Sequence, residues 1–472
     1  MTSGTVHSSQ KPPRHVVSGV PTIRRPRRIP NLSVVDQIVG VHSIRKDQVG
    51  FLYKVIQEYG DIAWVRVLGI KMAMVNHPDF FEHILVRNHE NYTKNTFLFR
   101  AVEPILRGGL IGNVGGEPWR RQRRIMQPSF HRPQVAGFAE NMTEETSRML
   151  RRWDTQYKPG DVVNVSTELG QLAMRIVFRS LFGADIGDRG KSIEDMFLEA
   201  NQIVGGFFRF PFPPINWPTP GHLRLKKIIK TMDGYVTDVI DSRIGSDEQH
   251  HDLLNALLNA VDHDGTGMSP LQLHREVLNL IIGGYETTSN TVSWLMYMVG
   301  QHPDVQAKLQ AEVDSVLGGR VPGFDDVLKL TYTRQVVDET LRLYTPAWQT
   351  MRSSVEEDEI NGYRIPAKAD LYLNMFTLHR HRDYWTDPDT FDPDRFLPAE
   401  VAKRPRHAYI PFASGPRNCI GKHFALTELV IILAMITQAY RVVIPEKLRD
   451  VQVEPLITLH PKGGVHLRMD RR

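Results

Sequence analysis

This sequence has almost no cysteine. Cys419 is the only one in 472 residues, so the chain can form no internal disulfide and no cysteine-rich metal or iron–sulfur site. A long apolar run is also missing: the longest, Leu429 to Ile436, is far below the roughly 18–20 residues that span a membrane. A single thiol suits a reducing compartment. We therefore expect a cytoplasmic protein without a membrane anchor.

Acidic side chains are absent from the first 35 residues, which combine basic residues with prolines. The prolines prevent the amphipathic helix of a mitochondrial transit peptide, and no apolar stretch follows Arg24-Arg25 as a twin-arginine export signal requires. We predict a disordered basic arm over residues 1–35. Because the remainder contains no linker or internal repeat, residues 36–472 are predicted to form a single domain.

The overall composition excludes several classes of protein. Apolar residues make up 41% and charged residues 24% of the chain, and the formal net charge is +5, as in an ordinary soluble globular protein. No interleaving of basic and aromatic residues points to nucleic acid. Short strands are expected within 60–69, 72–75, 353–365 and 451–467, and helices elsewhere in 118–455. The predicted fold class is mainly α with a minor β region.

The surroundings of Cys419 suggest more than a buried thiol. It lies in the segment Pro411-Phe-Ala-Ser-Gly-Pro-Arg-Asn-Cys-Ile-Gly421. Gly415 and Gly421 permit a tight turn and close approach to a flat partner. The helix expected after Gly421 would help to hold a thiolate charge, and Arg417 adds a cation. A lone cysteine is often a small core residue, but this pattern favours a single axial metal ligand.

A second unusual segment lies within one long predicted helix. Ser269-Pro270 is a strong helix start, and the helix runs to about Gly300. Its middle reads Gly-Gly-Tyr-Glu-Thr-Thr over residues 283–288. Two adjacent glycines cost a helix about 1–2 kcal/mol relative to alanine, so they need a reason. Close packing of a neighbouring helix is one possible reason, and a functional site is the other.

The pattern Phe412-x-x-Gly415-x-Arg417-x-Cys419-x-Gly421 resembles the haem-binding signature of the cytochrome P450 superfamily. The family often has glycine after the phenylalanine, where this chain has alanine. The resemblance implies that Cys419 is the thiolate ligand of haem b iron, with Phe412 and Gly421 beside it. It also implies the cytochrome P450 fold, with haem between a long central helix and the cysteine loop.

Residues 283–288 resemble the oxygen-activation motif of the same family. The resemblance implies that Gly283 and Gly284 face the haem, and that Thr287 and Glu286 are the catalytic alcohol and acid. Cleavage of the O–O bond of the co-substrate O2 consumes protons, and a paired acid and hydroxyl can relay them. Gly283 stands where alanine is commoner, which leaves more room in the pocket.

Two further motifs complete the resemblance. Glu339-Thr-Leu-Arg342 places both charged groups on one helix face, and Arg395 lies in a segment that resembles the one that completes a Glu-Arg-Arg triad. We assign this triad a structural role, that of holding the cysteine loop. His379-Arg-His381 lacks further ligands, so a metal site is not expected there.

Cations for the two haem propionates are implied by the resemblance. Trp119-x-x-x-Arg123 matches the family pattern in which an indole N–H and a guanidinium both reach a propionate. Arg352 and Arg417 are the other candidates, because arginine binds a carboxylate in bidentate fashion and stays charged. Trp119 by itself could equally be a core residue.

The substrate pocket is defined less sharply. The regions that line it in the family contain aromatic and apolar residues here, each of which could instead belong to the core. Together they imply an apolar substrate such as a terpenoid, steroid, fatty acyl or polyketide-like molecule. The candidates are Phe97, Phe99, Phe207, Phe208, Tyr285, Ala347 and Trp348.

Electrons must come from a separate protein, because one thiol cannot hold an iron–sulfur cluster and no flavin module is present. A basic face near the cysteine loop could attract an acidic ferredoxin or flavodoxin served by an NAD(P)H reductase. These basic residues could also be ordinary solvated side chains. They are Arg120, Arg121, Arg124, Arg404, Arg406 and Lys422.

The combined motifs predict a haem-thiolate monooxygenase that inserts one atom of O2 into an apolar substrate. A peroxide-driven or rearranging relative would use the same haem, but such enzymes usually lose the acid–alcohol pair kept here as Glu286-Thr287. A non-catalytic haem sensor would need neither that pair nor a basic docking face. The missing membrane anchor favours a bacterial source.

Overall fold

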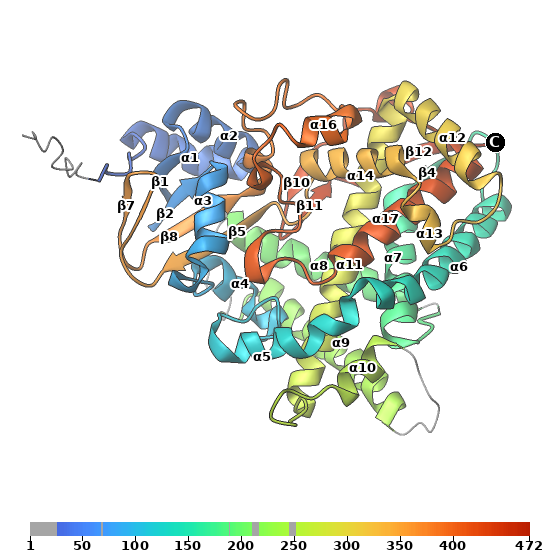
Figure 1. The fold of residues 1–472 in the computed structure, drawn as a ribbon, viewed down its shortest axis with the longest axis horizontal. Coiled ribbons are helices and arrows are strands. Elements are labelled where there is room, and N and C mark those ends of the chain that lie inside the picture. Colours follow the sequence, from blue (N-terminus) through green and yellow to red (C-terminus); the bar gives the residue numbers. More distant parts are fainter. Residues whose placement is uncertain (1–25, 68, 188, 210–216, 245–251) are drawn as a thin grey trace, which may run out of the picture.

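The computed structural model describes residues 26–472 except 68, 188, 210–216 and 245–251. Helices dominate one side of the molecule, and a small sheet forms the other (Figure 1). The helices are α1 Val34–Lys46, α2 Gln48–Tyr59, α3 Pro78–Glu82, α4 Phe97–Leu106, α5 Gly116–Met126, α6 Arg132–Gln156, α7 Val165–Phe182, α8 Arg189–Arg209, α9 Pro220–Ile244, α10 Leu253–Asn259, α11 Pro270–Gln301, α12 Pro303–Leu317, α13 Phe324–Val327, α14 Thr331–Leu343, α15 Met375–Leu378, α16 Pro398–Val401 and α17 Lys422–Ala439.

The strands form one five-stranded sheet and three smaller ones. The large sheet has the order β1-β2-β8-β5-β3, in which only the β2–β8 pair is parallel. The hairpin of β1 and β2 and the C-terminal strands confirm the strands expected from sequence. The strands are β1 Ile62–Val67, β2 Ile70–Val75, β3 Tyr92–Thr93, β4 Val162–Asn164, β5 Gln349–Ser354, β6 Asp358–Ile360, β7 Tyr363–Ile365, β8 Asp370–Asn374, β9 Tyr440–Val443, β10 Val453–Pro455, β11 Leu459–Pro461 and β12 His466–Arg471.

The boundary predicted for the N-terminal arm is wrong at its inner end. Residues 1–25 of the predicted arm lie outside the described residues. Ile29 and Leu32, however, are buried in the cores around the sheet, and the Trp64 N–H donates to the Pro30 carbonyl at 2.7 Å. Ser33 then caps α1 by accepting from the Asp36 N–H. Isolated apolar residues among prolines carry no periodicity, which is why their burial was missed.

Helix α11 is the central spine of the molecule (Figure 1). Ser269 caps it as predicted, accepting from the Gln272 N–H at 3.2 Å, and Pro270 occupies its first turn. One side packs on α7, and α17 crosses it on another. Helix α17 is long and apolar enough by composition to cross a membrane, but 72% of it is buried inside the protein. Its apolar surface therefore belongs to the core.

Candidate active site

The cysteine loop between the sheet side and α17 is held in an unusual backbone conformation. The Cys419 N–H donates to the Phe412 carbonyl at 2.8 Å, which closes the turn. Gly415 has φ of 72°, and a Cβ there would lie 1.9 Å from the Leu85 carbonyl oxygen, so only glycine fits. Ala413 also has a positive φ, 56°. This left-handed backbone explains why glycine is common at that position in similar loops.

The Cys419 side chain is accessible at the end of this loop, directly before α17. The surrounding protein raises the pKa of the thiol, while the Gly421 N–H, Arg123 and Lys422 oppose that rise by favouring the thiolate. The described structure also leaves open space two residues further on: no atom beyond the chain neighbours of Gly421 lies within 4 Å of where its Cβ would be. A planar group can therefore approach the sulfur.

A cavity of about 280 Å³ lies between α11 and the cysteine loop. Gly283, Glu286 and Thr287 border it from α11, and Ala413 and Arg417 border it from the loop. The Thr287 hydroxyl donates to the Gly283 carbonyl at 2.7 Å within the helix. The structure thus brings together the two segments that the sequence singled out, although they are separated by more than a hundred residues.

The two glycines of α11 have different surroundings. Gly283 borders the cavity, with Ile111 3.3 Å from where its Cβ would lie. Gly284 faces α7 instead, and a Cβ there would meet Val177 at 2.9 Å. The predicted contact of Gly284 with a cofactor is therefore corrected to close helix packing. Successive residues of an α-helix are rotated by about 100° around its axis, so the two glycines point in different directions.

Glu286 borders the cavity and is hydrogen-bonded to two other parts of the fold. Its Oε1 accepts hydrogen bonds from the Asn201 amide of α8 at 2.5 Å and from the Thr458 hydroxyl at 2.6 Å, and His460 Nε2 of β11 lies 2.6 Å away. Burial raises the pKa of Glu286, but His460 and these hydrogen bonds outweigh that effect and hold it below its usual value. Glu286 is therefore ionised at neutral pH.

Two buried cations, Lys94 and Arg352, and the partly buried Arg417 border the cavity. Within the described residues none has a carboxylate partner: Lys94 donates to the Ile111 carbonyl, Arg352 to Met351, and Arg417 to the carbonyls of residues 113 and 114. Burial, assisted by the neighbouring Arg417, lowers the pKa of Arg352 to about 9. Unpaired buried cations are costly, so this arrangement requires an anion.

Sequence reasoning missed Lys94, because a single lysine after a short strand has no distinguishing pattern. Two predicted propionate ligands, Trp119 and Arg123, lie against Arg417 and the cysteine loop. The Arg417 guanidinium lies over the Trp119 ring, with its carbon 4.2 Å from the ring centroid. Arg123 holds the cysteine loop from outside, donating to the carbonyl and side-chain oxygens of Asn418, both at 2.8 Å. Neither borders the cavity; both line a surface hollow that Arg417 also borders.

The predicted substrate-pocket residues divide into several groups. Phe99 and Ala347 border the cavity, and Phe97 borders a smaller apolar pocket next to it. Tyr285 and Trp348 are corrections, because both are buried in the core. The Tyr285 ring packs on Phe197, and the Trp348 indole donates to the Leu456 carbonyl. The side chains of Phe207 and Phe208 lie outside the described residues.

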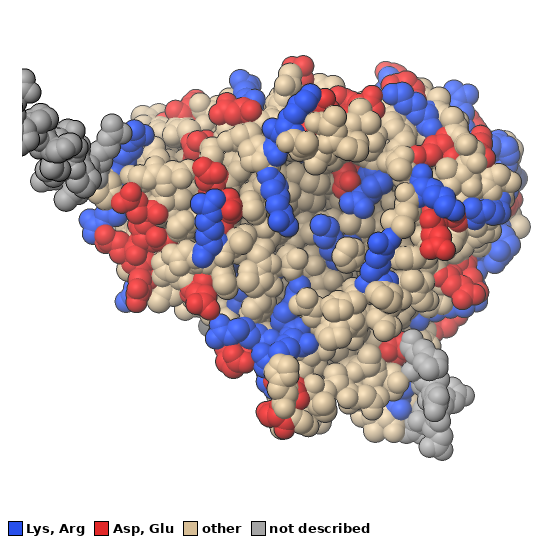
Figure 2. All heavy atoms as spheres, viewed as in Figure 1, with Lys and Arg blue, Asp and Glu red and all other residues tan. Residues whose placement is uncertain are grey.

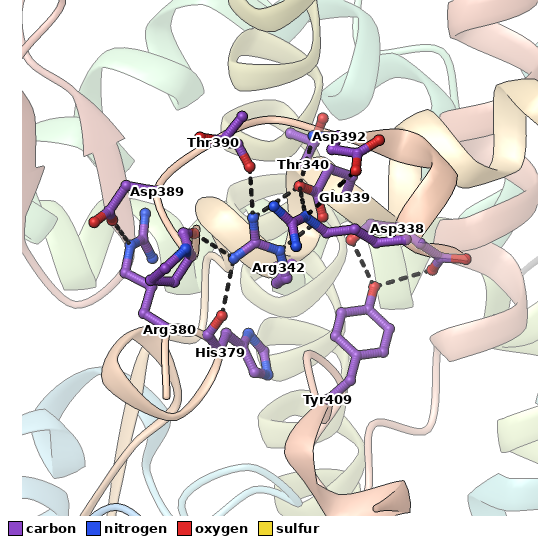
Figure 3. Close-up of polar contacts among 12 residues, drawn as sticks. Asp338, Glu339, Thr340, Arg342, His379, Arg380, Asp389, Thr390, Asp392 and Tyr409 are labelled. Carbon is purple, nitrogen blue, oxygen red and sulfur yellow. Dashed lines mark hydrogen bonds and ion pairs between the residues drawn. The ribbon is translucent and has the colours of Figure 1, made fainter. Parts of the chain in front are cut away.

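The segment that supports the cysteine loop is held by a buried ion pair (Figure 3). Both nitrogens of the Arg342 fork reach Glu339 at 2.7 Å, and both side chains have 0% exposure. Arg395 approaches Glu339 at 3.5 Å. Arg342 also donates to three carbonyls of the segment 379–390, as the dashed lines of Figure 3 show. The pair thus bridges α14 to that segment.

His379 and His381 flank the same region. His379 Nε2 accepts from the Ile410 N–H at 3.0 Å, and His381 contacts Asp61. Among the described residues no group of three or more metal-ligating side chains is gathered there or elsewhere. His379 therefore supports the start of the cysteine loop.

The face over the cysteine loop is less uniformly basic than expected. Figure 2 shows lysine and arginine side chains over the middle of this face and most acidic residues at its margins. On α5, Arg120 and Arg124 pair with Glu117, and Arg121 and Arg124 pair with Asp262. Arg404 stacks on the Trp385 ring. Arg406 and Lys422 are exposed, and within the described residues neither has a carboxylate partner.

The cavity suits haem b. Its two propionates are carboxylates, and the buried Lys94 and Arg352 and the partly buried Arg417 have no carboxylate partner among the described residues. The Cys419 thiol is exposed, so a flat ring can reach it, and no side chain crowds Gly421. The wall of the cavity is otherwise mostly apolar, as a porphyrin face and an apolar substrate require.

Comparisons with known proteins agree with this geometry. The family described as "Cytochrome P450" matches residues 26–468. "Cyclooctatin synthase" of Streptomyces melanosporofaciens is 34% identical over 389 residues, 81% of this chain and 83% of the relative. "Pentalenene oxygenase" of Streptomyces avermitilis is 30% identical over 421 residues, 88% and 92% of the two chains. "Cyclooctat-9-en-7-ol 5-monooxygenase" of Streptomyces melanosporofaciens is 31% identical over 388 residues, 81% and 83%.

The matched family, the cysteine loop and the unpaired cations lead to one conclusion. The enzyme uses haem b and O2, inserts one oxygen atom into an apolar substrate, and receives its electrons from a redox partner. This chain belongs to the cytochrome P450 family and is a haem-thiolate monooxygenase.

Proposed function

We propose that this enzyme hydroxylates a cyclic terpenoid hydrocarbon. The observation that carries this proposal is a mostly apolar cavity that the Glu286–Thr287 pair borders, with Lys94, Arg352 and Arg417 also on its wall. Such a cavity selects a substrate by shape, because few groups on its wall can hydrogen-bond to a ligand. The names of two relatives mention pentalenene and cyclooctat-9-en-7-ol, which supports this substrate class. Apolar side chains on the wall include Phe99, Val102, Ile105, Ile111, Phe197, Met232, Leu278 and Ile282.

Four side chains are proposed to hold the haem. Cys419 would supply the thiolate ligand, and Lys94, Arg352 and Arg417 would bind the propionates. Arg123 acts from outside by fixing Asn418 next to the thiolate. When bound, the haem supplies O2 activation, which thiolate ligation biases towards O–O cleavage. Glu339, Arg342 and Arg395 support the segment that leads to the loop and take no part in the chemistry.

The proposed roles of Glu286 and Thr287 concern protons. Both border the cavity on neighbouring positions of α11, and Glu286 is held as a carboxylate that accepts and releases a proton. The Thr287 hydroxyl, now bonded to the Gly283 carbonyl, can donate into the cavity after rotation about its Cα–Cβ bond. Together they would deliver protons to the reacting oxygen while the apolar wall excludes bulk water.

The electron donor is proposed to be a ferredoxin-type carrier with an NAD(P)H reductase, in the cytoplasm. Arg406 and Lys422 flank the cysteine loop, are exposed and have no carboxylate partner within the described structure. They would attract an acidic partner. With a plant-type ferredoxin, Arg406→Glu and Lys422→Glu should lower the rate of reduction more at low salt than at high salt. An unchanged rate at low salt contradicts this docking face.

The substrate proposal is tested by titrating the ferric protein with pentalenene and, in parallel, with a fatty acid and a steroid. Displacement of water from the iron shifts the Soret band, and we expect the shift with the terpene. Saturation by the fatty acid or steroid, with no response to the terpene, contradicts the proposed class. Cys419→Ser is the control for the cofactor site: reduced protein with carbon monoxide should lose the red-shifted Soret band of thiolate ligation.

A further inference from the structure

One histidine contacts the proposed proton-delivering acid, and no motif predicts it. His460 lies on β11, and its Nε2 approaches Glu286 Oε1 at 2.6 Å, the Asn201 amide at 2.8 Å and the Thr458 hydroxyl at 3.0 Å. A carboxylate can only accept, so Nε2–H donates to Glu286. The same oxygen also accepts hydrogen bonds from the Asn201 amide and the Thr458 hydroxyl. Three chain segments therefore meet at one carboxylate oxygen.

His460 contacts this carboxylate but does not itself border the cavity. The Glu286 side chain is 9% exposed and borders the cavity, whereas the His460 side chain is 13% exposed and is absent from the cavity wall. In the β10–β11 ladder, Glu454 is the register partner of His460. Register partners project from the same face of a sheet, so a second, partly exposed carboxyl lies beside the imidazole on that face.

The other neighbours of Glu286 cannot replace the imidazole. Asn201 and Asn290 are amides and have no proton to exchange near neutral pH, and Thr458 is buried. Burial raises the pKa of Glu194 on α8 to about 8, but within the described residues this carboxyl makes no hydrogen bond to Glu286 and so cannot pass a proton to it directly. Imidazole is the side chain that both accepts and donates a proton in this pH range.

We propose that His460 is a positioning residue that holds the Glu286 carboxylate at the cavity and resupplies its proton from solvent. This inference rests on the proposed role of Glu286. An arginine in this place would also hold the carboxylate, but it would not release a proton. The histidine thus holds the Glu286 carboxylate in place and can also exchange a proton with it.

The proton step balances without any further reagent. The Nε2–H bond of His460 breaks as an O–H bond forms on Glu286, and Nδ1 takes a proton from water on the outer side. One proton moves inwards, and no electron is transferred. Loss of the Nδ1 proton to solvent and uptake of a solvent proton at Nε2 restore the starting tautomer.

The first test compares His460→Gln with a matched histidine. Glutamine keeps a donor amide but cannot pass on a proton. The control is His274→Gln, a partly buried histidine on α11 that faces Asp233 away from the cavity. NADPH consumption is measured without substrate, in H2O and D2O, with excess plant-type ferredoxin and its reductase. We expect His460→Gln to slow it about tenfold, less than loss of a direct general acid because water can bypass the ring, and to enlarge the solvent isotope effect.

Glu286→Gln, measured alongside, separates the two proposals. If His460→Gln equals wild type in rate and isotope effect while Glu286→Gln is slow, the inference about His460 is wrong and the role of Glu286 stands. If both variants equal wild type, the proposed role of Glu286 fails as well. A slow His274→Gln would mean that histidine replacement acts through the fold, which also overturns the inference.

The second test needs neither turnover nor a folded His460 variant. In reduced, carbon-monoxide-treated protein labelled with ¹⁵N-histidine, the Nε2–H proton of a short imidazole–carboxylate bond should give a low-field resonance. It should be present in the wild type and lost in Glu286→Gln. Absence of the resonance in the wild type, or its persistence in Glu286→Gln, overturns the proposed bond.

Discussion

Glu286 and Glu339 are both buried carboxylates with several hydrogen-bond donors, yet their partners differ. Arg342 binds Glu339 through two guanidinium nitrogens, and neither side chain is exposed. Glu286 is instead surrounded by an amide, a hydroxyl and an imidazole, and it borders the cavity. A permanent cation locks a carboxylate in its charged form. Neutral donors and an imidazole stabilise the charge but still allow a proton to arrive.

The contacts of these two carboxylates also lie in different parts of the molecule. Arg342 extends the ion pair to the carbonyls of residues 379, 388 and 390, so the segment before the cysteine loop is bound to α14. Around Glu286, the contacts instead join α8, α11 and the turn between β10 and β11. The Glu339–Arg342 ion pair therefore stabilises the part of the protein that carries Cys419. The hydrogen bonds to Glu286 involve groups that can exchange protons, and they lie where protons are needed.

Breaking the Glu339 pair should have the largest effect. Glu339→Gln leaves the Arg342 charge buried without its partner, which typically costs about 3–5 kcal/mol. Denaturant unfolding should detect this loss, together with poor haem incorporation in the carbon-monoxide spectrum. Glu400→Gln is the control, because its pair with Lys403 is exposed and such pairs contribute under about 1 kcal/mol. Equal stability of the two variants would contradict the assigned role.

Glu286→Gln should separate stability from activity. The amide oxygen can still accept from Asn201 and Thr458, so we expect a loss of no more than about 1–2 kcal/mol in unfolding free energy. Turnover should fall about a hundredfold, the lower range for loss of a general acid. The matched control is Glu276→Gln, another buried carboxyl on α11, which accepts from the Leu110 N–H. Wild-type turnover in Glu286→Gln would refute the difference drawn between the two carboxylates.

A third carboxyl, Glu194, tests what burial does without a partner. Burial raises its pKa to about 8, whereas the ordinary value is 4.5. Between these pH values the unfolded chain releases its proton and the folded chain keeps it, so Glu194 destabilises the fold increasingly as pH rises. The unfolding free energy of Glu194→Gln relative to wild type should therefore be higher at pH 8 than at pH 5. No gain would mean that Glu194 has a partner when ionised.

Glu286 should show the opposite pH dependence, and this is the smallest effect expected. Its folded pKa is lowered, so its contribution to stability is present above pH 4.5 and is lost as pH falls through the folded pKa. The difference in unfolding free energy between wild type and Glu286→Gln should shrink below pH 4.5. A constant difference would contradict the lowered pKa.

Local patterns predicted much of the fold, but not every role within the site. Ser269-Pro270 started α11 as expected, and residues 62–75 form the expected hairpin. The same patterns could not distinguish Gly283 from Gly284, because only the position of α7 decides which one faces a helix. Tyr285 and Trp348 were assigned to the pocket because aromatic character does not reveal on which side of a helix or loop a ring packs. Spacing likewise placed Glu339 and Arg342 on one face without revealing that the pair is buried.

The chain by itself determined the chemistry, since one cysteine in a glycine-bracketed loop and one acid–alcohol pair in a long helix are local features. Only the tertiary structure decided what surrounds that chemistry. Lys94, Arg352 and Arg417 meet at the cavity, and His460 meets Glu286, through contacts between residues far apart in the chain. Such contacts depend on how whole helices and strands pack, and no local propensity encodes them.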